Sequence, residues 1–455
     1  MQREPKSAYA WSGLTRASFA LGFHGEARKA AARLLALAPG DSATEYLLSI
    51  SEHHTGHTAS AVQRLRRLSA AGTAIAEEAS FALAEVLEQA GQHDELKEHI
   101  ERGGEWLKAD RSATFEAWLL AQVDRPAALA LLQRVARSGS SPGVRRTAGF
   151  AAVQMLDEDG RYREAFDLAR AVHADSAGSF DLGPLQARID AQRRAIDRMR
   201  PVRSDDSAAT AGGAGAKRVA FMLSLPRSGT TLVEQMLDRH PLLSGIGEYE
   251  GAVRMRRGVE ALGIEVGALD RLLPADASRL RREYFTEAES RARADARWML
   301  DKTLHTWTSL PWLSAVLPDA RYVQVERDPR DRAISMYLSN FHPTNWAFTS
   351  SLESIRTFTA LARSLVPHAV ERLSLPVVRV QYERLVADPE GEIRHVLDHL
   401  GLAFDPAVLE PESNRRTILT LSAQQVRRKI NSTSIGRWRN YAFAFGPEWD
   451  DMAPR

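Results

Sequence analysis

The sequence predicts a helical repeat region over residues 1–200, followed by an α/β domain with a central parallel sheet over residues 218–455. The repeat region is rich in Ala, Leu, Arg and Glu, contains few β-branched runs and has a period near 34 residues. The α/β region instead alternates short β-branched runs with helical patterns. Residues 201–217 between them are rich in Ser, Ala and Gly without periodicity, which is typical of a flexible linker.

The composition argues against several classes of protein. At 455 residues, with 44% hydrophobic and 26% charged residues, the chain is long enough for two or three domains. A net charge of +2 is small for a nucleic-acid-binding protein, and the absence of Cys excludes disulfides and thiolate chemistry. No apolar run reaches the roughly 18–20 residues that span a bilayer, and the first residues lack the apolar core of a signal peptide. We therefore expect a cytoplasmic protein that contacts neither membrane nor nucleic acid.

Five anchor positions divide the repeat region at intervals of 34 or 35 residues: Gly22, Gly56, Gly91, Arg125 and Gly160. Five residues after each anchor stands a small or apolar residue: Ala27, Ala61, Leu96, Ala130 and Ala165. Gly permits a tight turn between two helices, and a small residue lets them lie close together. Residues 8–178 thus resemble four to five tetratricopeptide repeats, with a plain helical bundle as the alternative. Such a solenoid implies docking of a protein partner or self-association, unless it only covers an apolar face of the second half.

Strand and helix patterns alternate after the linker. This alternation predicts a parallel sheet between helices, with a binding site beyond the carboxyl ends of the strands. We expect strands at Val219–Leu223, Arg297–Leu300, Arg321–Glu326 and Pro376–Gln381. We expect helices at Thr230–Arg239, Ala275–Ala296, Trp307–Ala315, Arg330–Asn340, Ile355–Glu371 and Glu390–Leu400.

The first expected strand ends in a loop suited to bind an anion, because backbone N–H groups converge there and the following helix dipole favours negative charge. The loop offers a guanidinium group and three hydroxyls, and its residues are Pro226, Arg227, Ser228, Gly229, Thr230 and Thr231. It is not a Walker A motif, since no Lys precedes the Thr pair. The absence of a Walker A motif argues against ordinary ATP hydrolysis.

Polar residues also follow the other three strands. Lys302 follows the second strand, Arg327 the third and Tyr382 the fourth. Because the carboxyl ends of parallel strands meet at one edge of a sheet, we expect these side chains to converge on the phosphate loop.

Four separated motifs then resemble a sulfotransferase domain of the P-loop type that uses 3′-phosphoadenosine 5′-phosphosulfate. They are PRSGTTL at 226–232, RDPRDRAIS at 327–335, VQYERL at 380–385 and SAQQVRRKINSTSIGRWRNY at 422–441. The resemblance covers about residues 217–446. It is closest to bacterial sulfotransferases with tetratricopeptide repeats and more distant from tyrosylprotein sulfotransferases. The latter are usually membrane-anchored, luminal and disulfide-bonded, so their protein substrate is not carried over to this chain.

The resemblance implies a role for each matching residue. The 226–231 loop would hold the 5′-phosphosulfate, and Arg327 and Ser335 the 3′-phosphate. Tyr382, Arg437 and Trp438 would lie beside the nucleotide. Lys302 would stabilise charge on the oxygen that bridges sulfur and phosphorus, assisted by Ser422. No metal is expected, since fixed cations can replace Mg²⁺ when the transferred group carries less charge than a terminal phosphate.

Glu248 stands where the tyrosylprotein relatives place their catalytic Glu, so we expect it to be the general base. His305 is an alternative base, because other sulfotransferases use a His after the second strand, whereas His240 is expected to cap a helix end. The acceptor is a hydroxyl, phenol or amine. Two other functions are weighed against sulfuryl transfer: a small-molecule kinase on the same architecture, and a silent adaptor with a vestigial nucleotide site.

Overall fold

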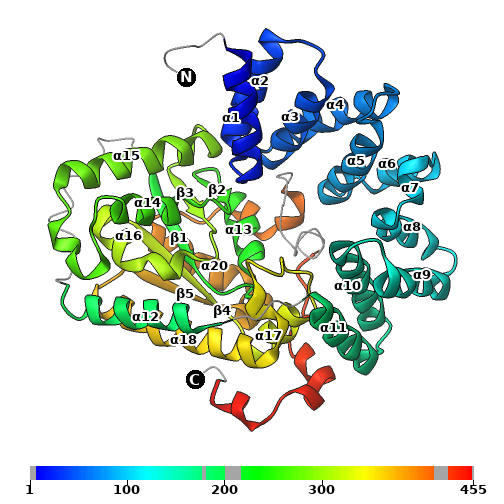
Figure 1. Cartoon of the computed structure of the whole chain (residues 1–455). Coiled ribbons are helices and arrows are strands. Elements are labelled where there is room, and N and C mark those ends of the chain that lie inside the picture. The colour runs from blue at the N-terminus through cyan, green and yellow to red at the C-terminus, as the bar shows by residue number, and fades with distance from the viewer. Residues whose placement is uncertain (1–6, 177–180, 200–216, 415–428, 453–455) are drawn as a thin grey trace. The chain divides into compact units, whose positions relative to one another are not determined.

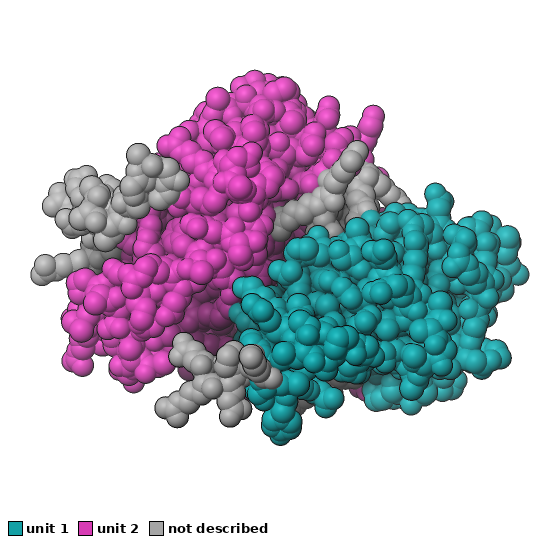
Figure 2. All heavy atoms as spheres, turned by 90° about the horizontal axis from the view of Figure 1, so that it is seen from above, with its two compact units in different colours: residues 1–168, 415–423 teal, residues 169–414, 424–455 magenta. Residues whose placement is uncertain are grey.

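A computed structural model describes residues 7–176, 181–199, 217–414 and 429–452. It divides the chain into two compact units, which Figure 2 colours separately. Unit 1 comprises residues 1–168 and 415–423, and unit 2 comprises residues 169–414 and 424–455. None of the described helices is both long and apolar enough to cross a membrane.

Unit 1 is built from antiparallel helix pairs that follow one another along a curved row (Figure 1). Gly22, Gly56, Gly91 and Gly160 lie between the helices of a pair with φ values of 74°, 86°, 70° and 72°, a backbone conformation that favours Gly. The helices are α1 Ala8–Ala20, α2 His24–Leu37, α3 Ser42–His54, α4 Thr58–Ala70, α5 Ala76–Ala90, α6 His93–Glu101, α7 Glu105–Lys108, α8 Ala113–Leu120, α9 Arg125–Ser138, α10 Pro142–Glu158 and α11 Tyr162–Ser176, the last of which runs on into unit 2.

The residue expected to close each helix pair is buried in four of the five copies. Ala27, Ala61 and Ala165 are 0% exposed and Leu96 is 1% exposed. In the fourth copy the expectation is wrong, because Ala130 is exposed and Ala128 is 0% exposed in its place. Each buried residue stands three positions after the first residue of its helix, and α9 begins at the predicted anchor rather than two residues after it.

The last helix of the predicted repeat region packs with unit 2. Helix α12 (Gly183–Ile196) lies against α18 (Leu352–Arg372), and its Ile189 is 0% exposed. The buried Gln192 donates from Nε2 to the carbonyl of Thr308 at 3.0 Å. The compact sheet unit therefore starts about thirty residues before the predicted domain boundary, because α12 supplies apolar cover for helices of the sheet domain.

The sheet of unit 2 contains five parallel strands in the order β2-β3-β1-β4-β5, which confirms the predicted central parallel sheet. One of these strands was not predicted. The strand Leu243–Gly247 has the sequence LSGIG, and Gly and Ser weaken its β-pattern. The strands are β1 Arg218–Leu223, β2 Leu243–Gly247, β3 Trp298–Asp301, β4 Arg321–Glu326 and β5 Val377–Gln381.

Helices cover both faces of the sheet. The β1–β2 crossover runs in the opposite direction along the sheet from the other three, so right-handed connections put α13 on one face and α14, α15 and α16 on the other. Figure 1 shows α13 and α20 on one side of the strands and α14 and α16 on the other. The helices are α13 Thr230–Asp238, α14 Gly251–Glu260, α15 Pro274–Arg291, α16 Leu310–Val316, α17 Pro329–Tyr337, α18 Leu352–Arg372, α19 Tyr382–Ala387 and α20 Pro389–Leu400.

Candidate functional site

The strand order brings the predicted site residues to one edge of the sheet. β1 lies between β3 and β4, so the loop after β1 is flanked by the residues that follow those two strands. Ser224 at the start of this loop accepts a hydrogen bond at its Oγ from the backbone of Val325 at 3.0 Å, which ties the loop to β4. The phosphate loop, Lys302 and Arg327 therefore share this edge.

The phosphate loop has a backbone that depends on its Gly. Gly229 has a φ of 94°, and a Cβ built on it would stand 2.2 Å from Cδ2 of Tyr382. Arg227 has a φ of 65°, which is uncommon for a residue other than Gly. The Oγ of Ser228 is fully buried and has no hydrogen-bond partner among the residues that the structure describes. An orphaned buried hydroxyl of this kind needs an explanation, and an anion bound in the loop would supply the missing partner.

Arg227 of this loop lies close to two other arginines, Arg327 and Arg437. The Nε of Arg227 donates to Oγ of Ser335 at 2.8 Å, and Nη1 of Arg327 donates to the backbone carbonyl of Arg227 at 3.0 Å. Burial, together with the positive charges of Arg327 and Arg437, lowers the pKa of Arg227 to about 10. The Nε of Arg327 is also buried, with no hydrogen-bond partner among the described residues. The loop thus has two further cations close to Arg227, and one of them offers an unused donor in this part of the chain.

Tyr382 connects the loop to a later segment of the chain. Its ring lies under the Arg327 guanidinium at 4.9 Å, and its hydroxyl hydrogen-bonds Oγ of Ser434 at 2.7 Å. Nη2 of Arg327 donates to the carbonyl of Ser434 at 2.5 Å. The backbone N–H groups of Gly436 and Trp438 donate to Asp331 at 2.6 and 2.8 Å. The ends of β4 and β5 therefore hold the segment that was expected to cover the nucleotide.

The expected residues in that segment differ in what surrounds them. The Trp438 indole lies under the guanidinium group of Arg330 at 3.7 Å. Trp438 also lines a pocket of about 470 Å³, whose charged lining residues are Asp328, Asp331, Glu383, Arg384 and Arg439. Ser422 lies outside the described residues.

Lys302 is buried between two carboxylates. Its Nζ donates to Oε1 of Glu248 at 2.8 Å and lies 3.9 Å from Oε2 of Glu234. The side chains of Lys302 and Glu234 are 2% and 3% exposed, whereas that of Glu248 is 44% exposed. The structure thus brings together the predicted Lys302 and Glu248, and Glu248 is the member of the pair that reaches solvent.

Glu234 was not predicted from the sequence. Its Oε1 accepts a hydrogen bond from the backbone of Gly247 at 3.0 Å, and the Gly247 carbonyl accepts one from the backbone of Lys302 at 3.0 Å. Glu234 therefore connects the ends of β2 and β3, which carry Glu248 and Lys302. A carboxylate among the apolar residues of α13 could have indicated a buried functional group. The sequence does not show, however, that all of α13 is buried.

Asp301, next to Lys302, was not predicted as a site residue. It is 0% exposed and accepts hydrogen bonds from Tyr284 Oη at 2.8 Å and from the Thr303 backbone at 3.0 Å. Burial raises the pKa of Asp301 to about 6, although the hydrogen bonds from Thr303 and Tyr284 oppose this shift.

The two histidines weighed as bases lie in different environments. His305 stacks on Trp346 with ring centroids 4.5 Å apart, and burial lowers its pKa while Glu248 opposes that shift. His240 accepts from the Leu242 backbone at Nδ1 and bonds the Ala403 carbonyl through Nε2 at 2.9 Å. The His240 ring therefore bonds residues outside α13, whose C-terminal cap is Arg239, so its predicted capping role is not seen, whereas His305 lies near Glu248.

Comparison with known proteins gives a consistent result. Residues 220–406 match the model of the family described as "Sulfotransferase family". Nodulation protein NoeE of Sinorhizobium fredii is 30% identical over 254 residues, covering 49% of this chain and 60% of that protein. Protein-tyrosine sulfotransferase 2 of Gallus gallus is 23% identical over 234 residues, covering 48% and 62%. An uncharacterised Aquifex aeolicus protein is 28% identical over 239 residues, covering 50% and 31%.

Among solved structures, the sulfotransferase domain from the curacin biosynthetic pathway aligns with 52% of this chain and 97% of its own length, at 18% identity and a TM-score of 0.37. The chain spans between about a third and three fifths of the curated relatives named above. The sheet domain is therefore similar in sequence to the sulfotransferase family over residues 220–406, and a helical region precedes it.

Proposed function

We propose that this chain transfers a sulfuryl group from 3′-phosphoadenosine 5′-phosphosulfate to a hydroxyl, phenol or amine acceptor. The observation that carries this proposal is the cluster of Arg227, Arg327 and Arg437 beside the orphaned Ser228 hydroxyl. The pKa of Arg227 is lowered first by burial and then by the positive charges of Arg327 and Arg437, so both effects disfavour its charged form in the absence of an anion. A ligand with several negative charges relieves this repulsion, and a nucleotide phosphorylated on both its 3′ and 5′ oxygens has that character.

The two phosphate contacts proposed from the sequence are neighbours in space. Arg227 of the loop already bonds Ser335, the residue assigned to the 3′-phosphate, and Arg327 bonds the Arg227 backbone. We infer that the N–H groups and hydroxyls of residues 226–231 bind the 5′ end of the donor, while Arg327 and Ser335 bind the 3′-phosphate. Guanidinium groups suit this task because their fork of donors matches a phosphate.

Lys302 and Glu248 supply groups suited to the transfer itself. In the proposed reaction Glu248 removes the acceptor proton as the acceptor–sulfur bond forms and the bond from sulfur to the bridging oxygen breaks. Lys302 neutralises the charge that develops on that oxygen. The 2.8 Å contact between the two side chains supports a shared site, and the 44% exposure of Glu248 leaves it open to an acceptor. His305 is the alternative base, and by resemblance Ser422 assists Lys302.

Thermal unfolding in the presence of nucleotides tests this proposal. A ligand that binds only the folded state at a hundredfold excess over its Kd stabilises it by about 2.7 kcal/mol. That amount raises the Tm of a domain of this size by roughly 5–10 °C. We expect this shift with adenosine 3′,5′-bisphosphate and none with ATP and Mg²⁺. A shift with ATP and Mg²⁺ alone would favour a kinase, and no shift with either nucleotide would favour a silent adaptor.

A further inference from the structure

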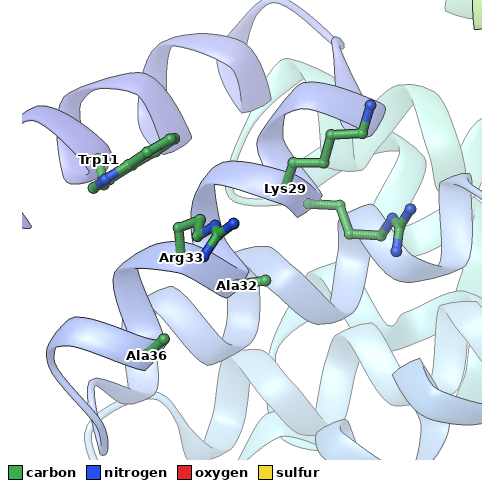
Figure 3. Close-up of a pocket in the computed structure, with 6 residues that line it drawn as sticks. Trp11, Lys29, Ala32, Arg33 and Ala36 are labelled. Carbon is green, nitrogen blue, oxygen red and sulfur yellow. The ribbon is translucent and has the colours of Figure 1, made fainter. Parts of the chain in front are cut away.

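The first helix pair of unit 1 contains a pocket that the proposed function does not use. The pocket has a volume of about 530 Å³ and lies between α1 and α2. Figure 3 shows Trp11 of α1 across from Arg33, Ala32 and Ala36 of α2, with Lys29 farther along the same helix. Its lining consists of Trp11, Arg28, Lys29, Ala32, Arg33 and Ala36.

Three positive charges line this pocket. Arg28, Lys29 and Arg33 form no ion pair with any described residue, and none of the described residues that line the pocket carries a carboxylate. The Nε of Arg28 is buried and has no hydrogen-bond partner in the described part of the chain. The next helix pair differs, because Arg64 and Arg66 of α4 pair with Glu52 and Glu95. Unpaired cations are therefore a property of the first pair rather than of every repeat.

The same helix pair exposes apolar surface. Tyr9, Leu21 and Leu37 are 91%, 67% and 43% exposed, and they are three of the eight large hydrophobic side chains that are exposed in the described part of the chain. The short side chains of Ala32 and Ala36 leave room opposite the Trp11 ring. Polar outer faces are usual on the terminal repeats of a solenoid, so a surface that is both apolar and cationic favours a partner.

We propose that this pocket docks an acidic peptide segment of a protein partner, with carboxylates on Arg28 and Arg33 and an apolar side chain against Trp11. The two arginines are five residues apart, about 7.5 Å along the helix, so the segment carries two carboxylates at that separation. A second copy of this chain joined by two-fold symmetry would place the same cations against each other, which is unfavourable. A small anion alone would bind the cations but would make no contact with the Trp11 ring.

The test measures binding of a fluorescein-labelled peptide, Glu-Glu-Leu-Phe-Glu-Glu, to the whole chain by fluorescence anisotropy. We expect binding that weakens as the salt concentration rises, and at least tenfold weaker binding of the peptide with Gln in place of Glu. The double variant Arg28→Glu/Arg33→Glu should lose at least tenfold in affinity. Trp11→Ala should lose severalfold, because the apolar side chain then has no wall to contact.

A matched control separates the pocket from the general effect of charge. Arg134 and Arg137 are exposed on α9, so Arg134→Glu/Arg137→Glu makes the same change in net charge and should keep the affinity within twofold. Arg327→Ala should also leave peptide binding unchanged, which makes the result independent of the nucleotide site. Circular dichroism and Tm confirm that each variant is folded.

Several outcomes would overturn the proposal. They are undetectable binding of the Glu peptide, equal binding of the Gln peptide, and equal losses in the pocket and control variants. Displacement of the peptide by inorganic phosphate, combined with no effect of Trp11→Ala, would leave only a small-anion site. A dimer that dissociates on Arg28→Glu/Arg33→Glu, measured by sedimentation velocity, would assign the surface to a second copy.

Discussion

Replacing Arg327 by Ala should weaken binding of adenosine 3′,5′-bisphosphate while leaving the ligand-free fold nearly as stable. The guanidinium group has a buried Nε with no hydrogen-bond partner among the described residues, and its other nitrogens bond two backbone carbonyls. A hydrogen bond to a charged group contributes about 1.5–3 kcal/mol. Loss of one such contact with the 3′-phosphate therefore weakens binding roughly 10- to 150-fold. Arg327→Lys keeps the charge without the fork of donors, so its loss should be smaller.

The ligand-free protein responds to two opposing changes in the Arg327→Ala variant. The bonds to the carbonyls of Arg227 and Ser434 are lost, at about 1.5 kcal/mol each, but the removal of a like charge beside Arg227 offsets part of this loss. We expect the Tm to fall by no more than a few degrees. Isothermal titration calorimetry measures the affinity, with Arg379→Ala as the control, since Arg379 is exposed on β5. Unchanged affinity in Arg327→Ala, or an equal loss in the control, would refute the assignment.

Three other predictions concern the neighbouring carboxyl groups. Glu248→Gln should lower turnover by about 10²- to 10⁴-fold and keep bisphosphate affinity, whereas the exposed Glu250→Gln should retain turnover; full turnover in Glu248→Gln would transfer the base role to His305. Glu234→Gln keeps an acceptor for the Gly247 backbone but removes a charge 3.9 Å from the Lys302 amine. Its turnover should fall by about tenfold, equivalent to roughly 1.4 kcal/mol, while its bisphosphate affinity stays the same, whereas unchanged turnover would leave Glu234 a purely structural role. The pKa of Asp301 is raised by burial to about 6 from 3.8, so its contribution to stability is full below about pH 4 and is lost as the pH rises through 6. Asp301→Asn should therefore remove about 3 kcal/mol of pH dependence from the free energy of unfolding, measured by denaturant titration between pH 4 and 7.5, and an unaltered dependence would contradict this origin.

Regular patterns in the sequence were sufficient to predict most of the fold. The strand Arg321–Glu326 was predicted residue for residue, and the phosphate loop was placed correctly between β1 and α13. β-branched runs and apolar periodicity are local signals, so they can be read without knowledge of tertiary contacts. The strand Leu243–Gly247 lacks such a signal, because its conformation depends on pairing with β3 and on the bond from Gly247 to Glu234.

The residues of the candidate site that belong to sequence motifs could be predicted. The residues whose role depends on burial could not. Lys302, Arg227 and Arg327 stand at strand ends, a position that topology makes significant. The roles of Glu234 and Asp301 depend on how deeply their helix and strand are buried. The composition of these elements does not show that depth. The wrong prediction that Ala130 is buried has a similar origin. The fourth anchor is an Arg, and the sequence does not show that the second helix of this pair begins two residues earlier than in the other pairs.

A crystal structure with adenosine 3′,5′-bisphosphate tests the central claim most directly. We predict one phosphate over residues 226–231, with the Ser228 hydroxyl donating to it, and the other phosphate within hydrogen-bond distance of Arg327 and Ser335. The Lys302 amine should then face the 5′ end of the nucleotide. A nucleotide bound elsewhere, or one that leaves the Ser228 hydroxyl and the Arg327 Nε without a partner, would contradict the proposed site.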